Sequence, residues 1–372
     1  MLYISFYFLI FTSSLYNIIT RKTNGFFCYL IAILLTLLAG LRSSDVGFDY
    51  QQYISIIKHI SLSPSILDSI IVNIRYEPLF VLISYFFSLL SSQNFIFIFI
   101  IFSFLGVFCK VILFKKYSYI PFLSLLLYFI SFYFSGDLAQ IRQSVAITFF
   151  LISIIYLEKN KIFISFVFII ISILFHYSSL INLLTFSLYF LYKKLTINSN
   201  FYFLLLALII SVLYSFINIK LSFYLSHIIP IEVISNKLTN YANSDYAVPL
   251  GFSISDLTRI ITCILIYTLI LPKNKNKNLI LLFSWLYILG CILYFILKSE
   301  GIFASRLTSY YKILDCFIIP YITYVLINKT KGKENKILIF LMVSILIFIY
   351  SFLSIYKNVL TIDEYQQYIM AI

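Results

Sequence analysis

The chain has 372 residues, of which 62% are hydrophobic and only 11% are charged. Soluble domains carry roughly 25% charged residues, so the composition excludes a soluble globular protein and indicates an integral membrane protein. The formal net charge of +13 does not indicate nucleic-acid binding, because the lysines gather in short breaks between apolar runs, as they do in cytoplasmic loops. The five cysteines lie within apolar runs without a CxxC spacing. We therefore expect no nucleic-acid partner, no metal site, no disulfide and no cofactor.

Apolar runs of roughly 16 to 22 residues recur along the chain, and each is about long enough to cross a ~30 Å hydrocarbon core as a helix. We predict an all-α, polytopic membrane protein with about 12 to 13 transmembrane helices, folded as a single transmembrane domain over residues 1–372. The first run lacks a basic start and a cleavage site, so we expect a retained span rather than a signal peptide. The predicted spans are 2–20, 26–41, 79–90, 95–114, 119–135, a run that ends at 158, 201–219, 252–271, 279–297, 302–327 and 337–356.

Three segments depart from this simple pattern. The run from Ile162 to about Tyr192 is too long for one crossing and predicts two short helices that meet at His176. The stretches near 42–75 and 220–251 are too short for an independent core, so we expect two interfacial loops on the outer face. From Asp49 to about Ile60, apolar and polar positions recur with the period of an amphipathic helix in the membrane interface.

The side of the membrane on which the 42–75 loop lies is ambiguous. Lysine-rich breaks in the rest of the chain share one side by parity, which the positive-inside rule assigns to the cytoplasm, and the rarer polar residues then fall on the outer side. Three predicted spans between Arg42 and Gly136 would place the loop inside, whereas the basic break at 21–22 favours outside. A re-entrant run between 77 and 135 would remove the conflict. We favour the outer face, because it brings the polar residues together.

Four arginines are candidates for binding phosphate oxygens, because the guanidinium is always charged and its planar fork matches them. Arg259 lies three residues after Asp256, a spacing at which the two charges neutralise each other on a helix. Snorkelling toward the interface or pairing with an acid is the alternative for the other three. The four are Arg42, Arg142, Arg259 and Arg306.

Three further residues are candidates for acid or base chemistry. Asp45 and Asp49 are four residues apart, with Gly47 between them favouring a turn. Two nearby carboxylates suit a divalent cation, sugar hydroxyls or a general base whose pKa is raised by its neighbour; the alternative is a solvated loop whose aspartate caps the next helix. His176 lies inside an apolar run, and its imidazole either relays a proton near neutral pH or serves as a hydrogen-bonded structural group.

Three short motifs occur in order within about residues 40–180. They are Leu41-Arg42 followed by Val46-Gly47-Phe48-Asp49-Tyr50-Gln-Gln-Tyr53, then Glu77-Pro-Leu-Phe, and then Ile141-Arg142-Gln143-Ser-Val-Ala146 with Phe175-His176-Tyr-Ser-Ser. Together they resemble the motifs of the EpsG-like family, a branch of the Wzy-type bacterial polysaccharide polymerases. Phe48 stands where that family usually has threonine, so the resemblance assigns no role to a hydroxyl there.

The resemblance implies a multi-pass glycosyltransferase of the bacterial inner membrane that polymerises repeat units of an O-antigen, capsule or exopolysaccharide. It would transfer a glycan from undecaprenyl diphosphate to the non-reducing end of another lipid-linked unit at the outer face. Implied partners are the lipid-linked oligosaccharide, membrane lipid, and a chain-length regulator and flippase of the same pathway. Combined with the candidates above, it assigns catalytic roles to His176, Asp49 and Asp45, and substrate-binding roles to Arg42, Arg142, Arg306, Tyr50, Tyr53, Glu77 and Gln143.

Two other functions are compatible with the sequence. A flippase or transporter of lipid-linked oligosaccharide would show repeat symmetry and polar residues along a path through both leaflets, whereas here they gather on one predicted face. An O-antigen ligase or membrane acyltransferase would share a site on the outer face. An assay with lipid-linked repeat units separates a ligase from a polymerase, because a ligase needs lipid A core as its acceptor.

Overall fold

The computed structural model describes most of the chain. The described residues are 2–43, 46–47, 49–89, 95–217, 219–220, 239, 249–274, 278–329 and 333–356. The regular elements within them are helices, which confirms the all-α prediction. Seven of these helices are long and apolar enough to cross a membrane, a broken pair adds an eighth if it forms one span, and four shorter apolar helices accompany them. The chain is therefore a multi-pass membrane protein. Asp45 and most of the 220–251 loop lie outside the described residues.

The chain divides into two compact units. The first contains Met1–Tyr177 and Asp315–Ile372, and the second contains Ser178–Leu314. The helices of the first unit are α1 (Leu2–Thr20), α2 (Gly25–Gly40), α3 (Tyr50–Ser61), α4 (Ile66–Val72), α5 (Pro78–Ser88), α6 (Ile96–Ser103), α7 (Cys109–Tyr117), α8 (Pro121–Tyr128), α9 (Ile141–Glu158), α10 (Ile162–Phe175), α18 (Asp315–Lys329) and α19 (Lys333–Ile355). Those of the second unit are α11 (Ile181–Lys194), α12 (Ile197–Tyr214), α15 (Ile254–Leu265), α16 (Leu279–Ile296) and α17 (Gly301–Lys312).

The helix boundaries follow the predicted spans closely, with two exceptions. The break at His176 is confirmed, because α10 ends at Phe175 and α11 begins at Ile181. The predicted span 79–90 corresponds to the 11-residue helix α5, which at about 1.5 Å per residue is too short to cross a ~30 Å core. The predicted span 302–327 is broken at residues 313–314 into α17 and α18, a bent pair that is long and apolar enough to count as one span.

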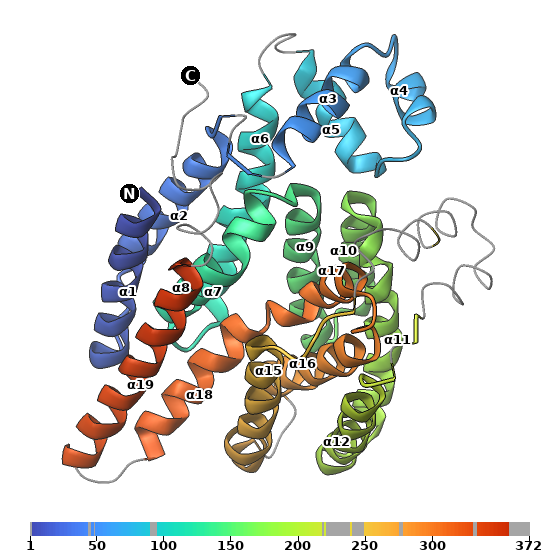
Figure 1. The fold of residues 1–372 in the computed structure, drawn as a ribbon. Helices are drawn as coiled ribbons and strands as arrows, with labels where there is room; N and C mark the ends of the chain where they lie inside the picture. The colour runs from blue at the N-terminus through green and yellow to red at the C-terminus, as the bar shows by residue number, and fades with distance from the viewer. Residues whose placement is uncertain are drawn as a thin grey trace. The chain divides into compact units, whose positions relative to one another are not determined.

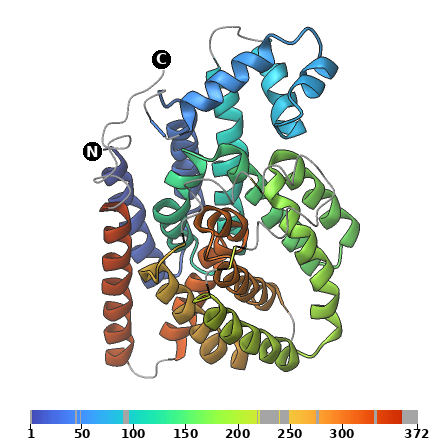
Figure 2. The same ribbon diagram turned by 45° about the vertical axis from the view of Figure 1, so that its right-hand side comes forward.

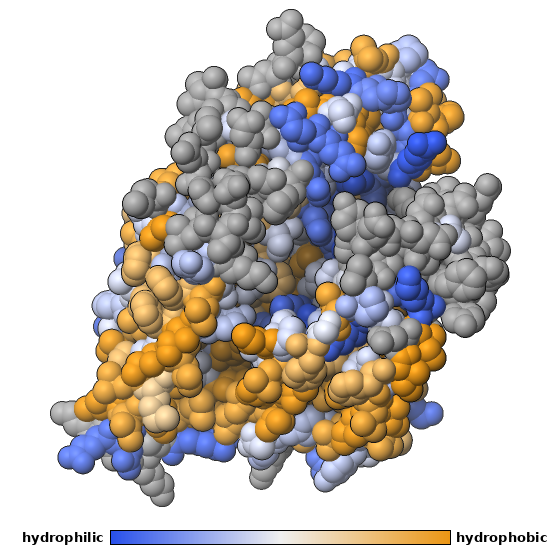
Figure 3. Space-filling model, in the orientation of Figure 1, coloured by the Kyte–Doolittle hydropathy of each residue, from blue (hydrophilic) through white to orange (hydrophobic). Residues whose placement is uncertain are grey.

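In the first unit, helices from the two ends of the described chain lie together. Figures 1 and 2 show α1 and α19 side by side, and the Tyr7 hydroxyl and Ser351 Oγ are 2.9 Å apart between them. Much of α19 exposes large apolar side chains such as Leu346, at 65% exposure. Apolar residues cover α18 and α19 in Figure 3, whereas hydrophilic ones gather over α3 to α5. This division suits a lipid-facing belt beside a polar rim.

Helix α9 forms the core of the first unit. Most of its residues are buried, and it packs along α10 in a helical hairpin. The two helices are joined by a tight turn in which Asn160 adopts a left-handed φ of 59°, and Ser172 Oγ of α10 donates to the Ala146 carbonyl of α9 at 2.7 Å. Because α9 is enclosed, its first turn, which carries Arg142, has a defined position.

The predicted amphipathic helix is confirmed as α3. Tyr53, Ile56 and Ile60 are buried on one face, and Gln51 and Gln52 are exposed on the other. Its end is joined to the end of α4 by a 3.0 Å hydrogen bond between His59 Nδ1 and Asn73 Oδ1. The α3–α4 segment thus leads, through a short turn, directly to Glu77 and the start of α5.

The second unit is centred on α16, which packs against α12 and α17. Gly290 allows the close approach of α17, because a Cβ at this position would lie 2.1 Å from the Cβ of Tyr311. Asp256 forms a 2.7 Å ion pair with Lys298, a partner that the sequence did not indicate. The guanidinium carbon of Arg259 lies 3.9 Å from the centroid of the Tyr294 ring.

Candidate functional site

The candidate site is organised around the carboxylate of Glu77, which is only 1% exposed. Glu77 precedes Pro78 at the N-terminus of α5, but its side chain does not cap that helix. It accepts instead a 2.5 Å hydrogen bond from Arg142 Nη1 and lies 2.9 Å from His176 Nδ1. The backbone N–H of Tyr177 donates to the same carboxylate at 3.3 Å. A buried carboxylate requires such donors, and here they come from 65 to 100 positions away in the sequence.

Arg142, the second residue of α9, lies in an aromatic surround. Its guanidinium carbon is 5.4 Å from the ring centroid of Tyr53, 5.7 Å from that of Tyr76 and 5.1 Å from that of Phe80. Aromatic faces stabilise a cation within about 6 Å. The side chain is 19% exposed, so this arginine is held by a carboxylate and aromatic rings while part of it still faces outward.

His176 lies where the chain leaves α10 in an extended conformation, with φ −158° and ψ 122°. Its backbone N–H makes the last i→i−4 hydrogen bond of α10, to the Ser172 carbonyl at 3.0 Å. The extended backbone at His176 then ends the helix, and the ring lies against Glu77. A carboxylate only accepts hydrogen bonds, so Nδ1 carries the proton and Nε2 of the neutral ring carries the lone pair. The His176 side chain is 19% exposed. This is the arrangement in which a carboxylate orients an imidazole for proton transfer.

Two tyrosines beside the cluster keep their hydroxyl protons at neutral pH. Burial raises the pKa of the Tyr53 hydroxyl, although the positive charge of Arg142 opposes the rise. Burial also raises the pKa of Tyr177, and the negative charge of Glu77 adds to this effect. The Tyr177 hydroxyl donates to the carbonyl of Tyr76 at 3.4 Å. Tyr53 and Tyr177 therefore do not act as bases in the site.

Arg42 has a different environment from Arg142. It is fully buried, donating from Nη1 to the Ala39 carbonyl at the end of α2 and from Nε to the Val46 carbonyl at 3.2 Å. Its guanidinium carbon lies 5.0 Å from the ring of Tyr50 and 5.2 Å from that of Phe99, and the two rings stack at 4.3 Å. In this structure Arg42 fixes the turn that follows α2.

The other predicted site residues are placed as follows. Asp49 is half-buried just before α3 without capping it, and its charge contributes to the raised pKa of Tyr53. Gln143 is buried next to Arg142. Arg306 is half-buried in α17 of the second unit, and Asp45 lies outside the described residues. Among the residues that the structure describes, no three His, Cys, Asp or Glu side chains are grouped as metal ligands.

The contacts of Glu77 bring the end of the 42–75 loop to Arg142 and His176. Glu77 follows this loop directly and touches both Arg142 and His176, while Tyr53 of the loop lies against Arg142. The end of the loop, Arg142 and His176 therefore belong to one cluster. At 11 residues, α5 is too short to be one of the three spans on which the inside placement of the loop depends.

The sequence analysis missed three polar residues. Tyr76 and Tyr177 flank Glu77 and His176, and their positions beside these motif residues were the available signal. The Lys110 side chain is 2% exposed and forms a 3.1 Å ion pair with Asp137. Its signal was a lone charge in the middle of an apolar run, which is costly in a membrane and indicates a specific partner.

Comparison with known proteins gives a family match over nearly the whole chain. Residues 25–370 match the EpsG family model. Over 155 residues the chain is 28% identical to the amylovoran biosynthesis protein AmsC of Erwinia amylovora, and this segment is 41% of each chain. The match thus spans about two fifths of that relative's length. No solved structure matches the chain. On the strength of the family match, this chain belongs to the EpsG family.

Proposed function

We propose that this chain is a membrane glycosyltransferase that polymerises lipid-linked oligosaccharide repeat units. It would transfer the growing glycan from undecaprenyl diphosphate to the non-reducing end of a second lipid-linked unit at the outer face of a bacterial inner membrane. Membership of the EpsG family and the name of AmsC, a protein of amylovoran biosynthesis, support a role in polysaccharide assembly. The observation that carries the proposal is the meeting of Arg142 and His176 on the buried carboxylate of Glu77.

Arg142 is placed to stabilise the leaving group. When the glycosyl–phosphate bond breaks, the electron pair stays with the lipid diphosphate, whose negative charge increases. A guanidinium held in advance by Glu77 and by the rings of Tyr53 and Phe80 stabilises that charge without reorganising. Its planar donor fork matches phosphate oxygens. Arginine therefore supplies the positive charge that this step requires.

His176 is placed to accept the proton of the attacking sugar hydroxyl. With Nδ1–H bound to Glu77, Nε2 takes the proton as the hydroxyl oxygen forms its bond to the anomeric carbon of the donor glycan. The imidazolium that forms is stabilised by the adjacent carboxylate, and its proton then passes to the departing diphosphate or to water. Asp49, half-buried beside α3, is a second candidate for binding or deprotonating the acceptor.

The proposal is tested with the purified full chain and lipid-linked repeat units. Wild-type protein is expected to produce long chains from these units alone, and Arg142→Ala and His176→Ala are expected to leave single units. Transfer only when lipid A core is supplied would identify a ligase and overturn the proposal. If both variants gave wild-type chain lengths at normal expression, the assignment of the site to Glu77, Arg142 and His176 would be wrong.

A further inference from the structure

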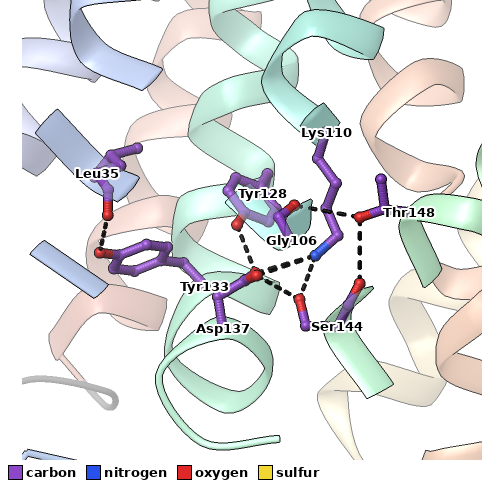
Figure 4. A network of polar contacts seen from close by, with 8 residues as sticks. All are labelled: Leu35, Gly106, Lys110, Tyr128, Tyr133, Asp137, Ser144 and Thr148. Carbon is purple, nitrogen blue, oxygen red and sulfur yellow. Dashed lines mark hydrogen bonds and ion pairs between the residues drawn. The ribbon is translucent and has the colours of Figure 1, made fainter. Parts of the chain in front are cut away.

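A second polar cluster is sealed inside the first unit, around the ion pair of Lys110 and Asp137 (Figure 4). Both side chains are 2% exposed. Asp137 Oδ2 accepts a 2.5 Å hydrogen bond from the Tyr128 hydroxyl and lies 3.1 Å from Lys110 Nζ. Ser144 Oγ accepts from Lys110 Nζ and donates to Asp137 Oδ1 at 2.5 Å. Each oxygen of the carboxylate thus receives more than one hydrogen bond.

Two π-helical segments and a glycine provide the space for this ion pair. Lys110 follows the π-helical segment Phe104–Phe108, and Asp137 ends a second one, Phe129–Asp137. Such segments are rare and often occur at functional sites. Gly106 lies in the first, and a Cβ there would be only 2.3 Å from Asp137 Oδ1. The carboxylate therefore occupies space that any larger residue at position 106 would fill.

The cluster holds both ends of the turn that leads into α9. Asp137 lies before this turn and Ser144 lies in the first helical turn after it, so their hydrogen bond closes the segment between them. Thr148, one turn further along α9, donates to the Gly106 carbonyl at 3.3 Å. Gly47 packs closely on the same turn: a Cβ at this position would lie only 2.2 Å from the Leu138 carbonyl oxygen. Arg142 projects from the segment that these contacts fix.

We propose that Lys110, Asp137 and Ser144 are positioning residues that set the place of Arg142 in the site. The inference rests on the proposed function for its activity readout. Neither charge of the pair can leave its partner without stranding a charge in a medium of low dielectric constant, so the turn is held in one geometry. Ser144 transmits this geometry to α9, and Arg142, two residues earlier, meets Glu77 as a result.

The test compares two buried serines of α9. Ser144→Ala removes the bridge to the ion pair without altering charge, and Ser153→Ala removes a hydroxyl that donates only to its own helix, at the Phe150 carbonyl. Since a misplacement on the order of 1 Å can cost about a hundredfold in rate, we expect Ser144→Ala to lower kcat about tenfold. KM for the lipid-linked unit should change little, because Arg142 acts mainly on the developing charge. Ser153→Ala should retain wild-type kinetics.

A thermal-melting cycle needs no substrate and separates this inference from the proposed function. Ser144 contacts Lys110 and Asp137 while Glu77 contacts Arg142, so the first turn of α9 links Ser144 to Glu77. We expect the losses in melting temperature from Ser144→Ala and Glu77→Gln to be non-additive, and those from Ser153→Ala and Glu77→Gln to add. Additivity in both pairs would overturn the inference. If wild-type protein failed to extend lipid-linked units, the proposed function would fall, and the melting cycle would still decide the positioning role.

Discussion

The Glu77 and Lys110 clusters are built from the same chemistry but differ in exposure. In each, a carboxylate holds a cation that also lies near the face of at least one aromatic ring, within the first unit. Arg142 and His176 are each 19% exposed, whereas Lys110 and Asp137 are 2% exposed. A cation that reaches the surface can contact a substrate while its carboxylate keeps it in place. A cation that is almost fully buried can only stabilise the fold.

The comparison also shows how a membrane protein can contain a charged site despite the desolvation cost of burying charge. Burial of either ion pair carries a desolvation cost that is recovered only if each charge keeps its hydrogen-bond partners. The Lys110 pair meets this condition inside the protein. The Glu77 cluster meets it with one buried carboxylate and two outward-facing groups, which leaves positive charge on the accessible side.

The largest expected effect is a loss of stability when one charge of the buried Lys110–Asp137 pair is removed. Lys110→Met strands the buried Asp137 carboxylate and should cost about 3 to 5 kcal/mol of unfolding free energy. Thermal melting of the purified protein measures this loss. Lys110→Met combined with Asp137→Asn should recover much of it, and Lys159→Met at an exposed position should have little effect. A double variant as unstable as Lys110→Met alone would contradict the ion-pair explanation.

The next largest expected effect is a loss of activity when His176 is removed from the Glu77 cluster. His176→Ala removes the proposed base and should lower polymerisation per folded molecule by about a hundredfold or more, with melting close to wild type because the ring is at the edge of the cluster. Chain extension on lipid-linked units measures the rate. His59→Ala serves as the control, because it removes an imidazole that is hydrogen-bonded to Asn73 on the α3–α4 segment. Equal rates for the two variants would exclude His176 as the base.

A smaller loss of stability is expected at Gly106, because the Asp137 carboxylate occupies the space that a side chain at this position would fill. Gly106→Ala places a methyl group 2.3 Å from Asp137 Oδ1, so the carboxylate must shift, at a cost of about 1 to 3 kcal/mol. Gly251→Ala introduces the same methyl group where no atom lies within 4 Å and should be neutral. Chemical or thermal denaturation of both variants checks this, and equal stability would mean that the pair tolerates displacement.

The smallest effect concerns the aromatic surround of Arg142. Tyr53→Phe keeps the ring near the guanidinium and should change the rate less than about threefold, whereas Tyr53→Ala removes a cation–π contact worth about 0.5 to 2 kcal/mol. Rates of chain extension for the two variants give the difference. A large loss in Tyr53→Phe would instead assign a direct role to the hydroxyl group.

Much of the helical framework could be predicted, because the patterns that specify it are local. Apolar runs place α1, α9 and α16 within a few residues, and the alternation of Ile56 and Ile60 with glutamines predicts the amphipathic helix α3. The break at His176 follows from a run that is too long for one crossing. The length of an apolar run was not always a guide to the helices within it. The run 79–90 contains only an 11-residue helix in its described part, and the run 302–327 contains two helices.

By itself, the sequence determined that the protein is a multi-pass helical membrane protein and which motif residues have suitable chemistry. Only the tertiary structure decided that Arg142 and His176 meet on Glu77, that Arg42 is enclosed at the end of α2, and that Lys110 pairs with Asp137. The physical reason is that hydrophobic periodicity is a local property. The high cost of a buried charge demands a partner, but helix packing decides which distant residue becomes that partner.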